Sequence, residues 1–449
     1  MISLKNDSIG KLLWEFSLPA IIGMLVNALY NIISRIFVGQ GVGYLAIAAV
    51  TVAMPVMILL MAVAMLVGVG ATALISIRMG EKKMDEVEKI AGNATALIIL
   101  LPLLLSFVYF LNAESLLVLF GASPEVLPYA KAYSNIIMLG AVPGAFAFGI
   151  NNFIRAEGNP RIAMLTQIFG AIINIVCNYI YIFIFDWGIQ GSAWAAVTGQ
   201  TVSALWVLSH FLLGRSRIKL RAKYLRLDPS IVLKTLTIGF APFAMQIANS
   251  IQQTLLNKTL WEYGGDIAIS AVGIIMSISM LLLMPVVGVS QGAQPIIGYN
   301  YGAKNYERVK ETLKKAVLVS TAMAVGGFIL LHLFAVPVVG LFSKNDLALT
   351  ELTVHAALIF LTLMPIIGFQ IVGSTYFQAV GKPIQSTILS LSRQVLLFIP
   401  LLLLLPRHFG IEGVWITAPI ADGLAVLVTG TFLFYELRKY KKPVLAMGD

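Results

Sequence analysis

GRSRIKLRAKYLRLDP, residues 214–229, is the most strongly charged run of this chain and lies at the midpoint of its 449 residues. It contains six Lys or Arg residues and a single acid, Asp228. A long apolar run stands on each side of it, residues 193–213 before and residues 231–260 after. A basic loop between two apolar segments is typical of a cytoplasmic connection in a membrane protein. A charged linker between soluble domains would not have such flanks.

The composition indicates the same class of protein. Hydrophobic residues make up 59% of the chain and charged residues only 12%, which is typical of a polytopic membrane protein embedded in a lipid bilayer. The net charge of +10 does not indicate a nucleic-acid partner, because the basic residues fall in short clusters between apolar runs.

Twelve stretches are long and apolar enough to span a bilayer, which needs about 20 residues of helix. The alternation of a β-barrel is missing, so the spans must be helices. The sequence therefore predicts an all-α integral membrane protein with twelve transmembrane helices. They are residues 12–37, 46–77, 90–111, 128–153, 163–185, 193–213, 231–261, 267–297, 317–334, 355–380, 384–405 and 414–437.

Basic residues predict the orientation of these spans. Both termini and every second loop are rich in Lys and Arg, whereas the opposite loops contain only Lys344 and Arg407. Because Lys and Arg are retained on the cytoplasmic side, we expect a multi-pass protein of the inner (cytoplasmic) membrane with both termini in the cytoplasm.

The two halves of the chain repeat one another at an offset of 222 to 223 residues. Six spans in each repeat make the repeats parallel, as in transporters that rock two lobes around a central site. We predict two pseudo-symmetric six-helix lobes, residues 1–218 and 219–449. The matched pairs include Pro19 and Pro242, Gly43 and Gly265, Gly70 and Gly292, Lys82 and Lys304, Gly158 and Gly381, and Gly188 and Gly410.

Pro19 and Pro242 open the first helix of each lobe. A proline inside a helix removes a backbone donor and can bend the helix. They are candidates for structural or gating roles, and tolerated packing kinks are the alternative.

Several short segments resemble the multidrug and toxic compound extrusion (MATE) family, and the resemblance covers essentially the whole chain. It is greatest to the bacterial branch that contains MepA-like and DinF-like proteins. The segments are Phe16-Ser17-Leu18-Pro19, Phe37-Val38-Gly39, Arg155-Ala156-Glu157-Gly158-Asn159-Pro160 and Gln378-Ala379-Val380-Gly381-Lys382-Pro383.

The resemblance implies a secondary active antiporter, not an enzyme. Such a protein exports amphipathic, often cationic organic compounds in exchange for protons or sodium by alternating access. It needs no cofactor besides the transported H⁺ or Na⁺. We expect small organic substrates as partners and a monomeric protein.

The sequence departs from the family where many members have an Asp in the first and fifth spans. Here those positions hold Ser34 and either Asn178 or Tyr179. The candidates for cation coupling in this lobe are therefore the uncharged residues Asn31, Ser34 and Asn178.

Asp422 is the one acid well inside a predicted span. A carboxylate there costs about 2.5–3.5 kcal/mol, so it should have a partner or a function. It is either a coupling site or the ion-pair partner of Arg393 in the preceding span. Its counterpart in the first half is Gln200, so the two lobes differ here.

Polar, aromatic and thioether side chains at helical spacing are candidates for the substrate cavity, and hydrogen bonding or packing between helices is the alternative. They are Asn27, Tyr30, Asn174, Tyr179, Gln246, Asn249, Gln253, Met280 and Tyr376.

Two other functions were weighed against export. A lipid-linked oligosaccharide flippase of the same superfamily should have a strongly cationic cavity, but only Arg35, Lys258 and Arg393 are intramembrane basic residues. A membrane-embedded lipid-modifying enzyme should show clusters of acids or histidines, and the sequence has none.

Overall fold

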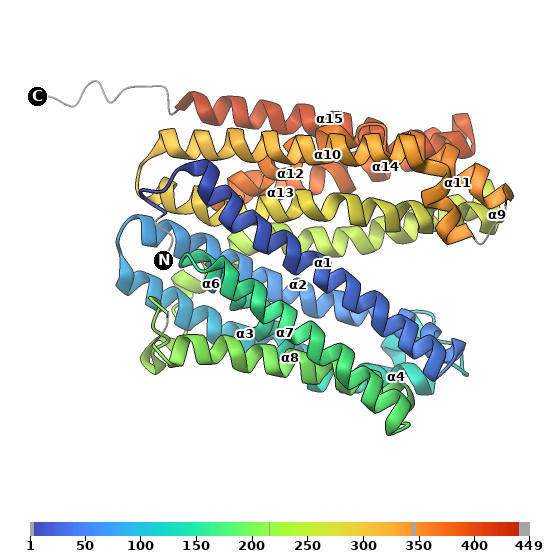
Figure 1. The fold of residues 1–449 in the computed structure, drawn as a ribbon, viewed down its shortest axis with the longest axis horizontal. Coiled ribbons are helices and arrows are strands. Elements are labelled where there is room, and N and C mark those ends of the chain that lie inside the picture. Colours follow the sequence, from blue (N-terminus) through green and yellow to red (C-terminus); the bar gives the residue numbers. More distant parts are fainter. Residues whose placement is uncertain (1–3, 215, 344–346, 440–449) are drawn as a thin grey trace, which may run out of the picture. The chain divides into compact units, whose positions relative to one another are not determined.

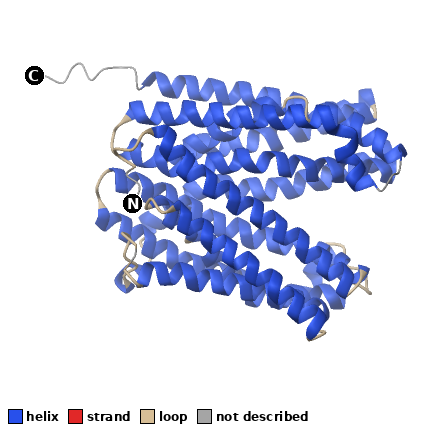
Figure 2. Cartoon of the chain, viewed as in Figure 1, coloured by secondary structure: helices blue, strands red, loops and turns tan. Residues whose placement is uncertain are grey.

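The computed structural model describes residues 4–214, 216–343 and 347–439. Figure 2 shows that these residues form helices joined by loops, with no strand among them. The all-helical prediction is therefore confirmed for this part of the chain. Two of the basic residues discussed above, Arg215 and Lys344, lie outside the described residues.

The chain divides into two compact units, which are described separately. Unit 1 contains residues 1–7 and 22–246, and unit 2 contains residues 8–21 and 247–449. Figure 1 labels the first long helix, α1 (Ile9–Gly41), and the helix α9 (Pro229–Gly302). Each of these two helices contributes residues to both units. The predicted lobes 1–218 and 219–449 are continuous segments, whereas each unit includes a piece of the other half's first helix.

Unit 1 contains most of α1 and the beginning of α9. Its other elements are α2 (Tyr44–Gly80), α3 (Met84–Leu119), α4 (Leu127–Leu139), α5 (Ala141–Gly149), α6 (Asn151–Ala156), α7 (Pro160–Tyr179), the π-helical η1 (Ile180–Ile184), α8 (Gly188–Leu212) and the 3₁₀-helical η2 (Ala222–Leu225).

Unit 2 contains the beginning of α1 and most of α9. Its other elements are α10 (Tyr306–Ser343), α11 (Leu347–Phe360), α12 (Met364–Ala379), α13 (Pro383–Leu391), the π-helical η3 (Ser392–Leu397), α14 (Phe398–Phe409) and α15 (Ile411–Lys439).

The helices agree with the predicted spans. Within the described residues, nine helices are long and apolar enough to cross a membrane, and two pairs of helices bent by 55° and 51° bring the number to eleven if each pair is one span. The sixth predicted span, residues 193–213, lies on α8, which is not among these helices and pairs. The α9 helix holds two of the spans, separated at Gly265.

The internal repeat is also visible in the backbone. Four matched pairs of residues share the left-handed region of φ, which L side chains adopt only at a cost. Each pair occupies the same turn of its half, so the two halves use the same connections between helices. The φ values are 112° and 64° for Gly43 and Gly265, 62° and 58° for Lys82 and Lys304, 99° and 71° for Gly158 and Gly381, and 54° and 59° for Gly188 and Gly410.

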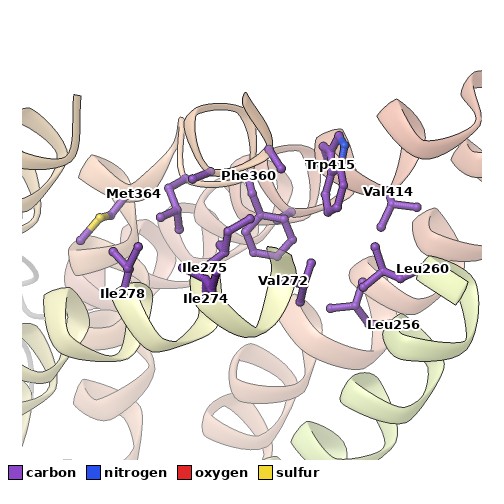
Figure 3. Packing of buried hydrophobic residues seen from close by; sticks show 14 of the residues in the cluster. Leu256, Leu260, Val272, Ile274, Ile275, Ile278, Phe360, Met364, Val414 and Trp415 are labelled. Atoms are coloured by element: carbon purple, nitrogen blue, oxygen red, sulfur yellow. The ribbon is translucent and has the colours of Figure 1, made fainter. Parts of the chain in front are cut away.

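Unit 2 has a continuous apolar core. Figure 3 shows side chains of α9, α11, α12 and α15 packed together, with Phe360 and the fully buried Trp415 among the largest. Leu256 and Leu260 from the first part of α9 and Val272 from the second part pack in the same cluster. The core therefore holds the two parts of α9 on either side of Gly265.

Glycines allow α9 to approach α2 closely in unit 1. A Cβ added at Gly70 would lie 2.1 Å from the backbone oxygen of Thr235, and one at Gly239 would lie 1.7 Å from that of Leu66. Unit 2 has the matching contact, since a Cβ at Gly292 would lie 2.7 Å from the backbone nitrogen of Ser17 on α1. Small residues are what permit such close packing of membrane helices.

Candidate functional site

Three uncharged side chains form a hydrogen-bonded cluster between α1 and α7 in unit 1. The Ser34 hydroxyl donates to Asn174 Oδ1 at 3.0 Å. The Asn178 amide donates to Ser34 Oγ and to Asn174 Oδ1, both at 3.1 Å. The four-residue spacing of Asn174 and Asn178 places both on one face of α7, toward Ser34.

One hydrogen-bond acceptor of the cluster, Asn178 Oδ1, is not used within it. Asn178 is fully buried, and its Oδ1 has no hydrogen-bond partner among the described residues. A buried acceptor without a partner is costly, and it would gain a favourable contact from a cation. The cluster can bind a cation only through neutral oxygens, because none of its three members is a carboxylate.

The other unit 1 candidates lie around this cluster without joining it. The Asn31 amide donates to Asn27 Oδ1 at 3.1 Å, and both residues are exposed. Tyr30 is half-buried. Tyr179 is 53% exposed, and its ring packs against Phe37 and Phe183. Asn27, Asn31 and Tyr179 thus offer polar and aromatic groups outside the core of the unit.

Asp422 on α15 forms an ion pair with Arg393 in unit 2. Arg393 Nε donates to Asp422 Oδ1 at 2.6 Å, and the Asp422 side chain is only 7% exposed. Arg393 comes from η3, where the wider π-helical turn interrupts the run of α13 and α14. Such interruptions are frequent at functional sites. The ion pair that the sequence suggested is therefore present, and it connects η3 to α15.

The next residue of η3 makes a second polar contact. The Gln394 amide donates to Asn249 Oδ1 on α9 at 2.5 Å, and Gln394 Oε1 is buried without a hydrogen-bond partner among the described residues. Further along α9, the Gln253 amide donates to Asn257 Oδ1 at 3.0 Å. Gln253 is exposed and Asn257 is half-buried. Consecutive residues of η3 thus contact Asp422 on α15 and Asn249 on α9.

The remaining candidates for the substrate cavity differ in their exposure. Met280 is 55% exposed on α9, whereas Tyr376 is fully buried and packs edge-on against Phe377. Tyr376 therefore presents no ring face to a substrate in this conformation. Gln246 is the last residue of unit 1 on α9 and is half-buried.

The two prolines lie near the points at which α1 and α9 pass from one unit to the other. Unit 2 ends at Ile21 on α1, two residues after Pro19, and unit 1 ends at Gln246 on α9, four residues after Pro242. Both prolines are buried within continuous helices.

Gln394 and three buried acids, Glu88, Glu157 and Glu436, were not predicted from the sequence. Gln394 was detectable as a polar residue beside Arg393 in an apolar span. Glu157 contacts His210, and Glu436 forms an ion pair with Lys382. Their positions at the ends of spans suggested solvent exposure, yet Glu157 is 2% and Glu436 5% exposed.

Comparison with known proteins identifies the family. The family described as MatE matches residues 19–180 and 242–404. The chain belongs to the MATE family. The two matched segments of this MATE protein begin at Pro19 and Pro242, so they follow the internal repeat. Members of the family are transporters, which excludes the enzyme hypothesis.

Curated relatives of this MATE protein cover almost its whole length. It is 25% identical to multidrug export protein MepA of Staphylococcus saprophyticus, over 97% of this chain and 95% of that protein. It is 27% identical to MepA of Staphylococcus aureus (strain MRSA252), with the same coverage.

Solved structures share the fold. One is an outward-facing multidrug resistance MATE family transporter, with a TM-score of 0.92, 25% identity and 98% of both chains covered. Another, with the same values, is a transporter of the MOP superfamily from Pyrococcus furiosus, whose binding pocket of reverse polarity suggests a different function.

Proposed function

We propose that this MATE transporter exports amphipathic organic cations by alternating access, in exchange for protons or sodium, and that Asp422 carries the coupling charge. The observation that carries the proposal is the position of Asp422. It is buried at the twelfth of the 29 positions of α15 and held by a single arginine. The relatives named as multidrug export proteins support the substrate class.

The ion pair lowers the cost of placing a coupling carboxylate inside the membrane. An unpaired carboxylate at this depth is unfavourable, but Arg393 neutralises Asp422 while no cation is bound. An incoming proton or sodium ion then competes with Arg393 for the same carboxylate oxygens. When a cation takes the carboxylate, Arg393 loses its partner, so cation binding changes the contact between η3 and α15.

The unit 1 cluster has a different role in this proposal. Ser34, Asn174 and Asn178 do not titrate near neutral pH, so they cannot carry a coupled proton. Their oxygens can still hold a sodium ion or the cationic part of a substrate. The two units thus contribute unequal groups to transport, as the mismatch of Asp422 and Gln200 predicts.

Neither alternative function has an observation in its favour. In unit 2 Arg393 is neutralised by Asp422, and in unit 1 Arg35 donates to Met54 Sδ at 3.3 Å, so each arginine already has a partner within its own unit. In the described part of the chain, no three His, Cys, Asp or Glu residues group to hold a metal ion.

Efflux from proteoliposomes tests the proposal. We expect a fluorescent organic cation to be moved against its gradient when either a proton gradient or a sodium gradient is imposed alone. An ionophore that dissipates the effective gradient should stop the movement, and protein-free liposomes should show none. If neither gradient moves any cation tested, the antiport proposal fails.

We also propose that the protein lies in the cytoplasmic membrane with both termini inside the cell. The concentration of Lys and Arg in alternate loops supports this orientation. In a Cys177→Ser background without other cysteines, a cysteine at position 407 should react with an impermeant maleimide on intact cells. A cysteine at position 304 should react only after lysis, and the reverse pattern would contradict this orientation.

A further inference from the structure

The central basic segment is not a flexible linker but a fixed part of unit 1. We call residues 216–228 the strap. At its beginning, the Arg217 backbone N–H donates to Glu157 Oε2 at 3.1 Å, and the Ser216 hydroxyl contacts the same carboxylate. Ile218, next along the strap, is fully buried. Glu157, in the turn that follows the fourth predicted span, thus holds the first residues of the strap.

The other end of the strap is held by Asn93 on α3. The Asn93 amide donates to the backbone oxygens of Tyr224 at 3.1 Å and Arg226 at 3.3 Å. Its Oδ1 accepts from the Asp228 backbone N–H at 2.6 Å. Asn93 is 3% exposed, so this side chain is a buried anchor that satisfies three backbone groups of the strap.

Two further contacts fix the middle of the strap. Arg221 Nε pairs with Glu88 Oε2 at 2.8 Å. Gly92 lies against the Tyr224 backbone, and a Cβ at position 92 would be 2.6 Å from the Tyr224 oxygen. The strap therefore lies in direct contact with the first turns of α3.

All five basic residues of the strap are exposed. Among the described residues, Lys219, Lys223 and Arg226 form no ion pair with an acid. Asp228 is the one acid of the strap, and its Oδ1 accepts from the Ser230 and Ile231 backbone N–H groups at the start of α9. The surface of the strap thus carries positive charge that no acid of the described residues neutralises.

Exposed leucines accompany these charges. Leu225 is 43% and Leu227 39% exposed, and Leu213 at the end of α8 is 69% exposed. The segment between α8 and α9 thus combines cationic and apolar side chains at the boundary of two spans. A membrane surface with anionic headgroups offers the complementary pair of groups, phosphate and acyl chain.

We propose that the strap is a binding site for anionic phospholipid headgroups, with Lys219, Lys223 and Arg226 as the residues that contact the phosphate. Its anchoring on Glu157, Glu88 and Asn93 fixes the backbone that carries these three cations. Ordinary positive-inside charge needs no such anchors, because it acts in any flexible loop.

Thermal unfolding of the detergent-solubilised protein tests this site without requiring transport. Dioleoyl phosphatidylglycerol should raise the melting temperature by about 3 °C over the same amount of dioleoyl phosphatidylcholine. Each basic residue near an anionic surface strengthens binding about fivefold, so the triple variant Lys219→Gln, Lys223→Gln, Arg226→Gln should weaken it about 100-fold and lose the shift. Glycerol phosphate, a free phosphate source, should give no shift.

Control variants distinguish an effect of the strap from a general effect of removing positive charge. Lys82→Gln, Lys304→Gln and Lys314→Gln remove the same charge from other exposed positions and should retain the shift. Asn93→Ala removes no charge but releases the strap, so it should reduce the shift. The proposal is overturned if the strap triple retains the shift, or if both triples lose it equally.

Discussion

Asp422→Asn is expected to reduce gradient-driven efflux to the level of protein-free liposomes. Asparagine cannot exchange a proton and binds a sodium ion weakly, so the coupling charge is lost. The substitution also leaves Arg393 as an unpaired cation in the membrane, and breaking a buried ion pair from one side costs about 3–5 kcal/mol. The measurement is efflux in proteoliposomes under the gradient that drives the wild type, with the melting temperature recorded beside it.

The double variant Asp422→Asn, Arg393→Gln separates coupling from stability. It removes both charges, so we expect a melting temperature close to that of the wild type but still no coupled efflux. Asp422→Glu retains the carboxylate and should retain part of the efflux. Gradient-driven efflux at the wild-type rate in the double variant would show that the ion pair serves structure alone.

Gly70→Ala is expected to destabilise the protein although it adds only one methyl group. Its Cβ would lie 2.1 Å from the Thr235 backbone oxygen, and this obstacle belongs to a helix backbone that cannot rotate away. Overpacking of this kind costs about 3 kcal/mol, which corresponds to a fall in melting temperature of about 6 °C. Scanning fluorimetry of the purified protein measures it.

Gly326→Ala is the matched control for this prediction. Gly326 also lies within a helix, α10, but a Cβ there would meet no atom within 4 Å. Alanine favours a helix by about 1 kcal/mol over glycine, so this variant should be as stable as the wild type or slightly more so. Equal melting temperatures for the two variants would contradict the close contact of α2 and α9.

The spans and the repeat could be predicted because both are patterns that can be read directly along the sequence. Apolar length gives the helices, and the constant offset gives the matched turns, where Lys82 and Lys304 share a left-handed backbone. The π-helical turn at η3 could not be predicted, because nothing in Ser392-Arg393-Gln394 distinguishes it from an α-helix. The contact of Gln394 with Asn249 depends on that turn and was missed with it.

The candidate site was predictable to different degrees in the two units. The spacing of Asn174 and Asn178 placed them on one face, and the family resemblance directed attention to Ser34. Exposure was harder to predict, since Tyr179 and Tyr376 look alike in sequence, yet one is 53% exposed and the other fully buried. Such differences arise from tertiary packing, which a pattern along one helix does not contain.

Because each unit includes a segment of the other half's first helix, splitting the gene between the two halves would divide both units. A cut after residue 218 would give an N-terminal polypeptide without residues 229–246, which complete unit 1, and with residues 8–21, which belong to unit 2. Neither fragment would contain all the helices of one compact unit. The two fragments should therefore accumulate in a cell only when they are produced together, each supplying the other's missing piece.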